Sequence, residues 1–391
     1  MATYTEESLR KKFKQIHKKF PTNFLECGGR FEILGNHTDH NHGLCLVGTC
    51  SLSIGAVVSK RDDNIVYLIS KGHDANFFSI DNLEPNAREY GSSSGLIKGI
   101  CKYLSDRGYK IGGFDAYMES DIKAGVGVSS SAAFELLIGK LMSFLYNDDK
   151  IDLLTLCKAG QFAENNYFDK KSGLLDQIGV AYGGINAIDF INIAEPKIYK
   201  LEIHFPDLHY ILVNTGGSHG DLSNYYSQVP ESMFTVAKHL GKNYLRDIPK
   251  QEFIDHFAKG EHTGVDRVDQ NRAKHFYEEN ERVLTALQAL KENDEKKFLD
   301  QINACQKSAQ VNLLNTQVDN HYEGSPQEAI DYANAILTDG ACKINGGGFA
   351  GSIICFVRDH ELKTFVEKMS ERYGKDNVIE LELRYEGPTA K

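Results

Sequence analysis

Near the end of its first third, the chain contains the run Gly125-Val126-Gly127-Val128-Ser129-Ser130-Ser131-Ala132-Ala133. Residues 114–119 before this run alternate as a strand does, and residues 134–142 after it have the pattern of a helix. Free backbone N–H groups and the positive end of the helix dipole meet at such a junction, which favours an anion. The glycines let a ligand approach the backbone, and the serines offer hydroxyls to phosphate or metal. The run predicts a phosphate-binding loop, with a serine N-cap behind a flexible turn as the alternative.

The composition of the 391 residues is typical of a soluble globular protein of two domains, with 41% hydrophobic and 25% charged residues. The chain has 54 Asp and Glu against 44 Lys and Arg, and this net charge of −10 argues against nucleic acid as a partner. None of the eight cysteines forms a C-x-x-C pair, which favours reduced thiols in a cytoplasmic protein. No apolar run is long enough to span a membrane and no signal-peptide pattern is present, so we expect no membrane partner.

The order of the expected elements indicates an α+β protein. In the first half we expect an amphipathic helix over 6–20, strands over 31–34, 44–58 and 64–70, helices over 131–146 and 152–168, and a strand over 185–193. In the second half we expect a strand over 209–215, mostly helix over 228–316, a helix over 326–338, a strand over 352–357, a helix over 360–373 and a strand over 378–383. The pattern changes around Pro196, which predicts domains 1–195 and 196–391.

A polar loop, Asn36-His37-Thr38-Asp39-His40, follows the strand that ends at Gly35. Its imidazole and carboxylate groups suit the hydroxyls of a polyhydroxylated ligand. Two alternatives remain at this point. His37-x-Asp39-His40 resembles half of a dinuclear metallohydrolase signature, although Gly35 stands where that signature has its first histidine. A purely structural Asx-turn loop is the other.

Two more clusters contain groups that chemistry needs. Glu164 lies on an expected helix and Asp176 follows shortly after it, so one carboxylate could orient magnesium and the other could accept a proton. Taken alone, Glu164 would be a solvated surface charge. The run 346–351, Gly-Gly-Gly-Phe-Ala-Gly, indicates either close approach to a ligand or a tight loop against another backbone. A P-loop motif is absent.

The three motifs together resemble those of the galactokinases, which belong to the superfamily of the homoserine, mevalonate and phosphomevalonate kinases. Residues 29–39 resemble the family signature G-R-x-N-L-I-G-E-H-T-D-Y, residues 125–133 resemble its G-x-G-L-S-S-S-A loop, and residues 346–351 resemble its G-G-G-F-G-G motif. The resemblance implies a two-domain kinase fold, with an N-terminal mixed-sheet domain like domain 2 of ribosomal protein S5 and a C-terminal ferredoxin-like domain. The active site would lie in the cleft between them.

The resemblance also implies roles for residues of this chain. ATP would bind over Gly125, Val126, Gly127, Val128, Ser129, Ser130 and Ser131, and Ser131 and Glu164 would hold Mg²⁺. Asp176 would accept the proton of the anomeric C1 hydroxyl of a sugar, and Arg30 would stabilise charge on the transferred phosphoryl group and keep Asp176 ionised. The residues expected to bind the sugar are Asn36, His37, Thr38, Asp39, Gly173 and Tyr226.

The expected reaction is therefore ATP-dependent phosphorylation of a monosaccharide, with galactose giving galactose 1-phosphate. Asn36 stands where the family has Glu, Glu32 where it has Asn, and Lys343 where it has Arg. Since an amide both donates and accepts whereas a carboxylate only accepts, a 1-kinase for galacturonic acid, arabinose or an N-acetylhexosamine is the alternative. A non-catalytic sugar sensor is a further one, although the serine loop, Asp176 and Arg30 are complete. We expect a monomer or a weak dimer.

Overall fold

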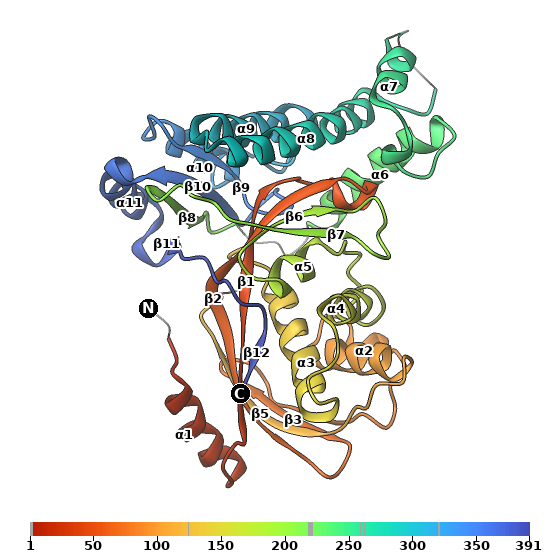
Figure 1. The fold of residues 1–391 in the computed structure, drawn as a ribbon, viewed down its shortest axis with the longest axis vertical. Helices are drawn as coiled ribbons and strands as arrows, with labels where there is room; N and C mark the ends of the chain where they lie inside the picture. The colour runs from red at the N-terminus through yellow and green to blue at the C-terminus, as the bar shows by residue number, and fades with distance from the viewer. Residues whose placement is uncertain (1–2, 124, 218–221, 259, 261–262, 320) are drawn as a thin grey trace.

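The computed structural model describes residues 3–123, 125–217, 222–258, 260, 263–319 and 321–391. Within this part of the chain, two β-sheets are covered by helices, as Figure 1 shows. The α+β class expected from the sequence is confirmed. The described helices include none with the length and apolar character needed to cross a membrane.

The first sheet has eight strands, in the order β12-β1-β2-β5-β3-β4, with β6 paired to β2 and β7 paired to β6. These strands are β1 (Asn23–Leu34), β2 (Leu44–Lys60), β3 (Ile65–Ser70), β4 (Asn76–Ser79), β5 (Phe114–Ser120), β6 (Ile185–Asp189), β7 (Lys197–Leu201) and β12 (Thr389–Ala390). Strand β2 is long enough to pair with β6 through residues 44–48 and with β5 through residues 54–60. It therefore links the two ends of the sheet.

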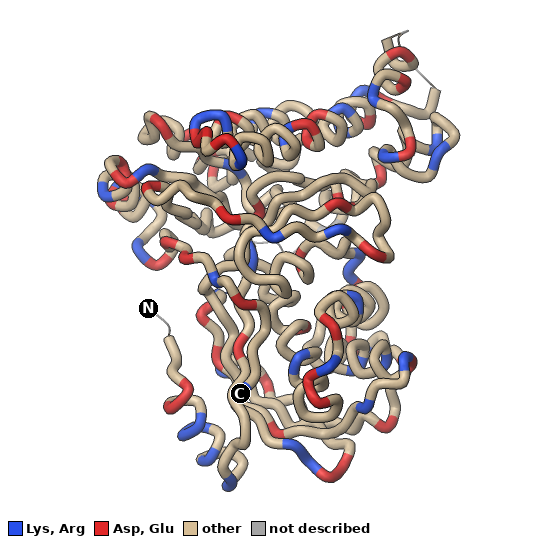
Figure 2. The backbone as a smooth tube through the Cα atoms, viewed as in Figure 1, with Lys and Arg blue, Asp and Glu red and all other residues tan. Residues whose placement is uncertain are grey.

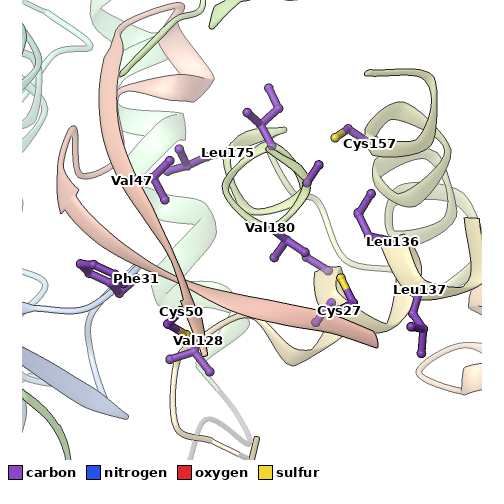
Figure 3. Close-up of a cluster of buried hydrophobic side chains, with 14 of the residues drawn as sticks. Cys27, Phe31, Val47, Cys50, Val128, Leu136, Leu137, Cys157, Leu175 and Val180 are labelled. Carbon is purple, nitrogen blue, oxygen red and sulfur yellow. The ribbon is translucent and has the colours of Figure 1, made fainter. Parts of the chain in front are cut away.

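Helices cover both faces of this sheet. Helix α1 (Glu6–His17) packs on one face, where its Leu9 and Phe13 meet Val57 and Tyr117. The other face carries α2 (Ser93–Ser105), α3 (Ser130–Tyr146), α4 (Leu153–Tyr167) and α5 (Leu175–Ala181). Figure 3 shows the buried core between this face and the helices, with residues from β1, β2 and α3 to α5. Burial of these apolar side chains fixes the helices that bear the site.

The second sheet is antiparallel, in the order β11-β8-β10-β9. Its strands are β8 (Leu208–Asn214), β9 (Ala341–Ile344), β10 (Ser352–Arg358) and β11 (Val378–Leu381). The helices of this half are α6 (Ser223–His239), α7 (Lys250–Phe257), α8 (Arg267–Glu292), α9 (Glu295–Ser308), α10 (Pro326–Asn334) and α11 (Asp359–Tyr373). Acidic and basic residues are interspersed along α8 and α9 in Figure 2, as expected for helices with a solvated face.

The first sheet takes strands from both sides of the expected boundary between residues 195 and 196. Strand β7 lies beyond that boundary, yet it pairs antiparallel with β6 because the turn between them is short. At the other end of the chain, β12 pairs with β1. The core is also continuous between the sheets, since the Phe31 and Tyr210 rings lie 5.1 Å apart. The first sheet is thus built from residues of both predicted domains.

Candidate active site

The serine loop connects β5 to α3 in a backbone conformation that leaves the start of α3 without a side-chain cap. Gly125 and Gly127 both have φ of 78°, and Ser129, the N-cap residue, has φ of 57°. A serine therefore occupies the N-cap position, as the alternative expected, but its hydroxyl makes no capping hydrogen bond. The loop lies directly on β1, where a Cβ added to Gly29 would come within 2.6 Å of the Val128 carbonyl oxygen.

Asp176, in the first turn of α5, lies between an arginine and the serine loop. Arg30 Nε and Nη2 are both 2.8 Å from Asp176 Oδ1, and the Ser129 hydroxyl donates to Oδ2 at 2.6 Å. Burial alone would raise the pKa of Asp176, but Arg30 and then Lys170 hold it below its ordinary value. Asp176 is therefore a charged carboxylate at neutral pH, next to the loop that the sequence assigned to phosphate.

Glu164, on α4, is buried rather than solvated, and four side chains donate to it. Ser131 Oγ and Lys170 Nζ donate to Oε1 at 2.8 and 2.6 Å. Ser172 Oγ and Gln177 Nε2 donate to Oε2, the latter at 3.2 Å. The surface-charge alternative for Glu164 is wrong, because its side chain is only 1% exposed.

The pairing of Ser131 with Glu164 fits a magnesium ion. A hydroxyl and a carboxylate are hard oxygen ligands, and Mg²⁺ commonly takes few protein ligands and completes its shell with phosphate and water. The dinuclear metal site expected of a metallohydrolase has no comparable set of ligands in the part of the chain that the structure describes. Within the described residues, no group of three or more His, Cys, Asp or Glu side chains, including His37, Asp39 and His40, is arranged to hold a metal ion.

Asp39 and Gly173, both expected to bind the sugar, are in close contact. A Cβ added to Gly173 would lie 2.0 Å from Asp39 Oδ2, so only glycine lets the loop after α4 reach this carboxylate. Thr38 is fully buried and its hydroxyl lies 2.9 Å from the Gly35 carbonyl oxygen and 2.8 Å from that of Leu44. Thr38 therefore holds the shape of the polar loop from within the protein.

His37 and Tyr226 both bind the third glycine motif. Burial lowers the pKa of His37 to about 4, so the ring is neutral and its Nε2–H donates to the Gly347 carbonyl at 2.9 Å. The Tyr226 hydroxyl donates to the Gly348 carbonyl at 2.9 Å, and its ring packs against Phe349. The three motifs, far apart in the sequence, thus meet at one place.

Tyr226 also lies near the charged groups of the site. Burial raises the pKa of its phenol to about 12, and Lys170, Arg30 and Asp176 are close enough to act on it electrostatically. Tyr226 is on α6, in the second half of the chain, whereas the other three residues are in the first. Both halves therefore contribute to the site.

Asn36, another residue expected to bind the sugar, is hydrogen-bonded within the protein. Its side chain is fully buried, and Nδ2 donates to Glu32 Oε1 at 2.9 Å and to the Gly346 carbonyl at 2.7 Å. Its Oδ1 accepts from Asn315 Nδ2 at 2.9 Å. Both amide hydrogens and the carbonyl oxygen are thus used within the protein.

Helix α8 holds the start of the polar loop. Burial lowers the pKa of His275 to about 4; the neutral ring donates from Nε2 to the Asn36 carbonyl at 2.9 Å and accepts at Nδ1 from the Ser308 hydroxyl. One turn later, Glu279 Oε1 accepts from the Gly35 N–H at 2.7 Å. The second half of the chain therefore fixes the position of the loop that carries His37 and Asp39.

Two functional neighbours were not predicted from the sequence, Lys170 and Asn345. Asn345 Nδ2 donates to the Gly127 carbonyl at 3.0 Å, the same oxygen that accepts from Arg30 Nη1 at 2.7 Å. Asn345 directly precedes the third glycine motif, which was the available signal. Lys170 stands in a run of charged residues, which predicts a solvated loop. In the structure this loop turns back on α4, so that Lys170 contacts Glu164.

The family models that match the chain cover two of these regions. Residues 11–60 match the galactokinase galactose-binding signature, and residues 95–184 match the GHMP kinases N terminal domain. The galactokinase of Lactobacillus helveticus is 29% identical, over 94% of this chain and 94% of its own. The galactokinase of Glaesserella parasuis is 30% identical, over 90% of this chain and 89% of its own.

Solved structures show the same fold. The structure of Lactococcus lactis galactokinase complexed with galactose matches with a TM-score of 0.83, at 23% identity over 97% of this chain and 98% of its own. The mevalonate kinase of Methanococcus jannaschii matches with a TM-score of 0.65, at 15% identity over 92% of this chain and 98% of its own. The predicted kinase fold is confirmed, and the chain belongs to the galactokinase family.

Proposed function

We propose that this chain transfers the γ-phosphoryl group of ATP to the C1 hydroxyl of galactose and forms galactose 1-phosphate. The observation that carries the proposal is the position of Asp176, an ionised carboxylate bound by Arg30 and by Ser129 of the serine loop. A base beside a phosphate-binding loop is what phosphoryl transfer to a hydroxyl needs.

The serine loop is proposed to bind the phosphates of ATP through its backbone N–H groups. The positive end of α3 and the missing side-chain cap at Ser129 support this role. Ser131 and Glu164 would hold Mg²⁺, which supplies charge neutralisation to the phosphates when bound. Arg30, held by Asp176 and by the Gly127 carbonyl, would stabilise charge on the transferred group.

The sugar hydroxyls are proposed to bind Asp39, His37, Gly173 and Tyr226. Gly173 contacts Asp39, and His37 and Tyr226 both bind the third glycine motif, so the four residues come from adjoining loops. Galactose is the favoured acceptor because curated relatives that match 94% and 90% of this chain are galactokinases. The alternatives among other sugars depend on a contact of the residue at position 36 with the sugar near C6, which the resemblance to the galactokinases implies. The hydrogen bonds of Asn36 lend no support to that contact, since they use both amide hydrogens and accept at the carbonyl oxygen of a fully buried side chain.

We also propose that the functional halves are residues 1–195 and 196–391, working as a cytoplasmic monomer or weak dimer on ATP and a monosaccharide. The eight cysteines support a reducing compartment, because all are free and buried. The net charge of −10 is consistent with small-molecule partners rather than nucleic acid.

The test is ADP release from MgATP across a panel of galactose, galacturonic acid, arabinose and N-acetylhexosamines. We expect galactose to give the highest rate and Asp176→Asn to lower it by roughly 10²–10⁴-fold. Asp169→Asn is the matched control, since Asp169 is exposed, lies in the same region and has φ of 62°, which Asn accepts readily. If no sugar stimulates ADP release, the proposed function is wrong; if Asp176→Asn keeps full rate, the base is another group.

A further inference from the structure

Lys170 places a second cation at the carboxylates of the site. It follows α4 in a loop that turns back on the helix, with its N–H donating to the Glu164 carbonyl at 3.0 Å. Its ammonium group donates to Glu164 Oε1 at 2.6 Å, although the Lys170 side chain is 46% exposed. The lysine thus reaches a buried carboxylate from the solvent side.

The ammonium group occupies the oxygen that a magnesium ion would use. Ser131 Oγ donates to the same Glu164 Oε1 at 2.8 Å, so Lys170, Ser131 and Glu164 converge on one point. A divalent cation bound to this oxygen would repel an ammonium ion hydrogen-bonded to the same atom. Lys170 and the metal therefore compete for Glu164.

Of the two, the lysine is the partner that can move. Glu164 stays fixed because Ser172 and Gln177 donate to its other oxygen. Lys170 has a flexible stem of four carbons and solvent on one side, so leaving Oε1 costs it little. Asp176 and Tyr226 are within electrostatic reach of its ammonium group, which places the charge at the reacting end of the site.

We propose that Lys170 is a further nucleotide-binding residue, whose ammonium group neutralises Glu164 in the free protein and binds a phosphate oxygen of ATP once Mg²⁺ takes Glu164. This inference rests on the proposed function. A lysine is well suited to move from a carboxylate to a phosphate. Its ammonium group is a compact charge that binds oxygens of both kinds and does not need a fixed geometry. The buried Glu164 carboxylate then has a cation beside it both in the free protein and in the metal-bound one.

The test measures binding rather than turnover. The probe is the non-hydrolysable analogue β,γ-imido-ATP, titrated by calorimetry in EDTA into the full-length wild type, Lys170→Met and Lys171→Met. Binding of Mn²⁺ to the same proteins, saturated with the analogue, is followed by electron paramagnetic resonance. Lys171, an exposed neighbour, is the matched control.

We expect Lys170→Met to bind the metal-free analogue at least tenfold more weakly, because the Glu164 carboxylate, no longer neutralised by an ammonium group, repels the phosphates. We also expect it to bind Mn²⁺ at least threefold more tightly, because Glu164 is free of its competitor. Lys171→Met should match the wild type within twofold in both titrations. If either constant of Lys170→Met stays within twofold of the wild type, the proposal is overturned.

Lys170→Gln is the second variant, to be used if Lys170→Met fails to fold, because its amide still donates a hydrogen bond to Glu164. We expect the same two shifts in binding, and the same limits apply. A merely structural lysine would weaken both titrations together and overturn the proposal. Failure of the proposed function looks different: a wild type that binds no nucleotide overturns both, whereas an active wild type with unchanged Lys170 variants overturns this inference alone.

Discussion

Asn36 Nδ2 donates a 2.9 Å hydrogen bond to Glu32 Oε1, and the Lys343 ammonium group donates to the same oxygen at 2.8 Å. Lys343 is fully buried and Glu32 almost so. At these two positions the family signature has Asn where this chain has Glu32, and Glu where it has Asn36. Relative to the signature, the amide and the carboxylate have therefore changed places, and Lys343 is the counter-ion of the Glu32 carboxylate.

This exchange predicts the behaviour of Asn36→Glu. The variant places a second buried carboxylate against Glu32, whose hydrogen-bonded cation is Lys343, and we expect a loss of about 3 kcal/mol or more of unfolding free energy. Glu32→Asn combined with Asn36→Glu restores one carboxylate and one amide, so most of the loss should return. Thermal unfolding of the two single variants and the double variant measures the coupling. Additive losses in the double variant would contradict this pairing.

The Arg30–Asp176 pair predicts the acid limit of activity. Arg30 holds the pKa of Asp176 below its ordinary 3.8 despite burial, so the base stays ionised, and kcat/KM should fall only below that pH. The stability that the pair contributes is present above pH 3.8 and is lost as the pH falls through the lowered pKa of the folded state. Arg30→Gln should shift the acid limb of the pH profile upward, whereas Arg30→Lys should shift it less. An acid limb that stays at the same pH in Arg30→Gln would assign it to another group.

Gly173→Ala tests the contact between the loop after α4 and Asp39. The added methyl group would overlap Asp39 Oδ2, so this carboxylate must move. We expect the KM for the sugar to rise roughly tenfold or more, because displaced binding groups act mainly on the substrate that they contact. The KM for ATP should change little, and Lys171→Ala serves as the control. An equal rise in both KM values would contradict a sugar-specific role for the contact between Gly173 and Asp39.

Ser131→Ala tests the assigned magnesium ligand. Removing one oxygen from the Ser131–Glu164 pair should raise the Mg²⁺ concentration for half-maximal activity by roughly 10-fold or more. Ser130→Ala, at the exposed first position of α3, is the matched control and should leave this concentration unchanged. The measurement is a Mg²⁺ titration at fixed total ATP. Identical titrations for Ser130→Ala and Ser131→Ala would remove Ser131 from the metal site.

The sequence predicted the groups whose spacing is set by local elements. The serine loop and the polar loop each follow a strand, and the structure places Arg30 against Asp176 and Ser131 against Glu164. The direction of Asn36 could not be predicted, because the register of β1 shifts between Glu32 and Leu34 and the strand alternation fails there.

Glycines interrupt the sequence patterns of two other elements, which were therefore not predicted correctly. Strand β1 begins at Asn23, eight residues before the expected start, because Gly28 and Gly29 interrupt its strand pattern. Helix α2 was not predicted for the same reason. Gly99 weakens its helical pattern, yet a Cβ there would come within 2.7 Å of Ala163, so the glycine permits close packing against α4. The pairing of β12 with β1 joins residues too far apart in sequence for any local pattern to indicate it.

The carbonyl of Gly127 accepts one hydrogen bond from Arg30 and another from Asn345. A polypeptide ending at residue 195 would contain Arg30, Ser131, Glu164 and Asp176, yet it would lack the second of these donors. It would also lack Lys343, and so would leave the Glu32 carboxylate without its counter-ion. Such a fragment would have the four groups proposed for phosphoryl transfer, yet it would lack contacts that hold its serine loop and balance Glu32.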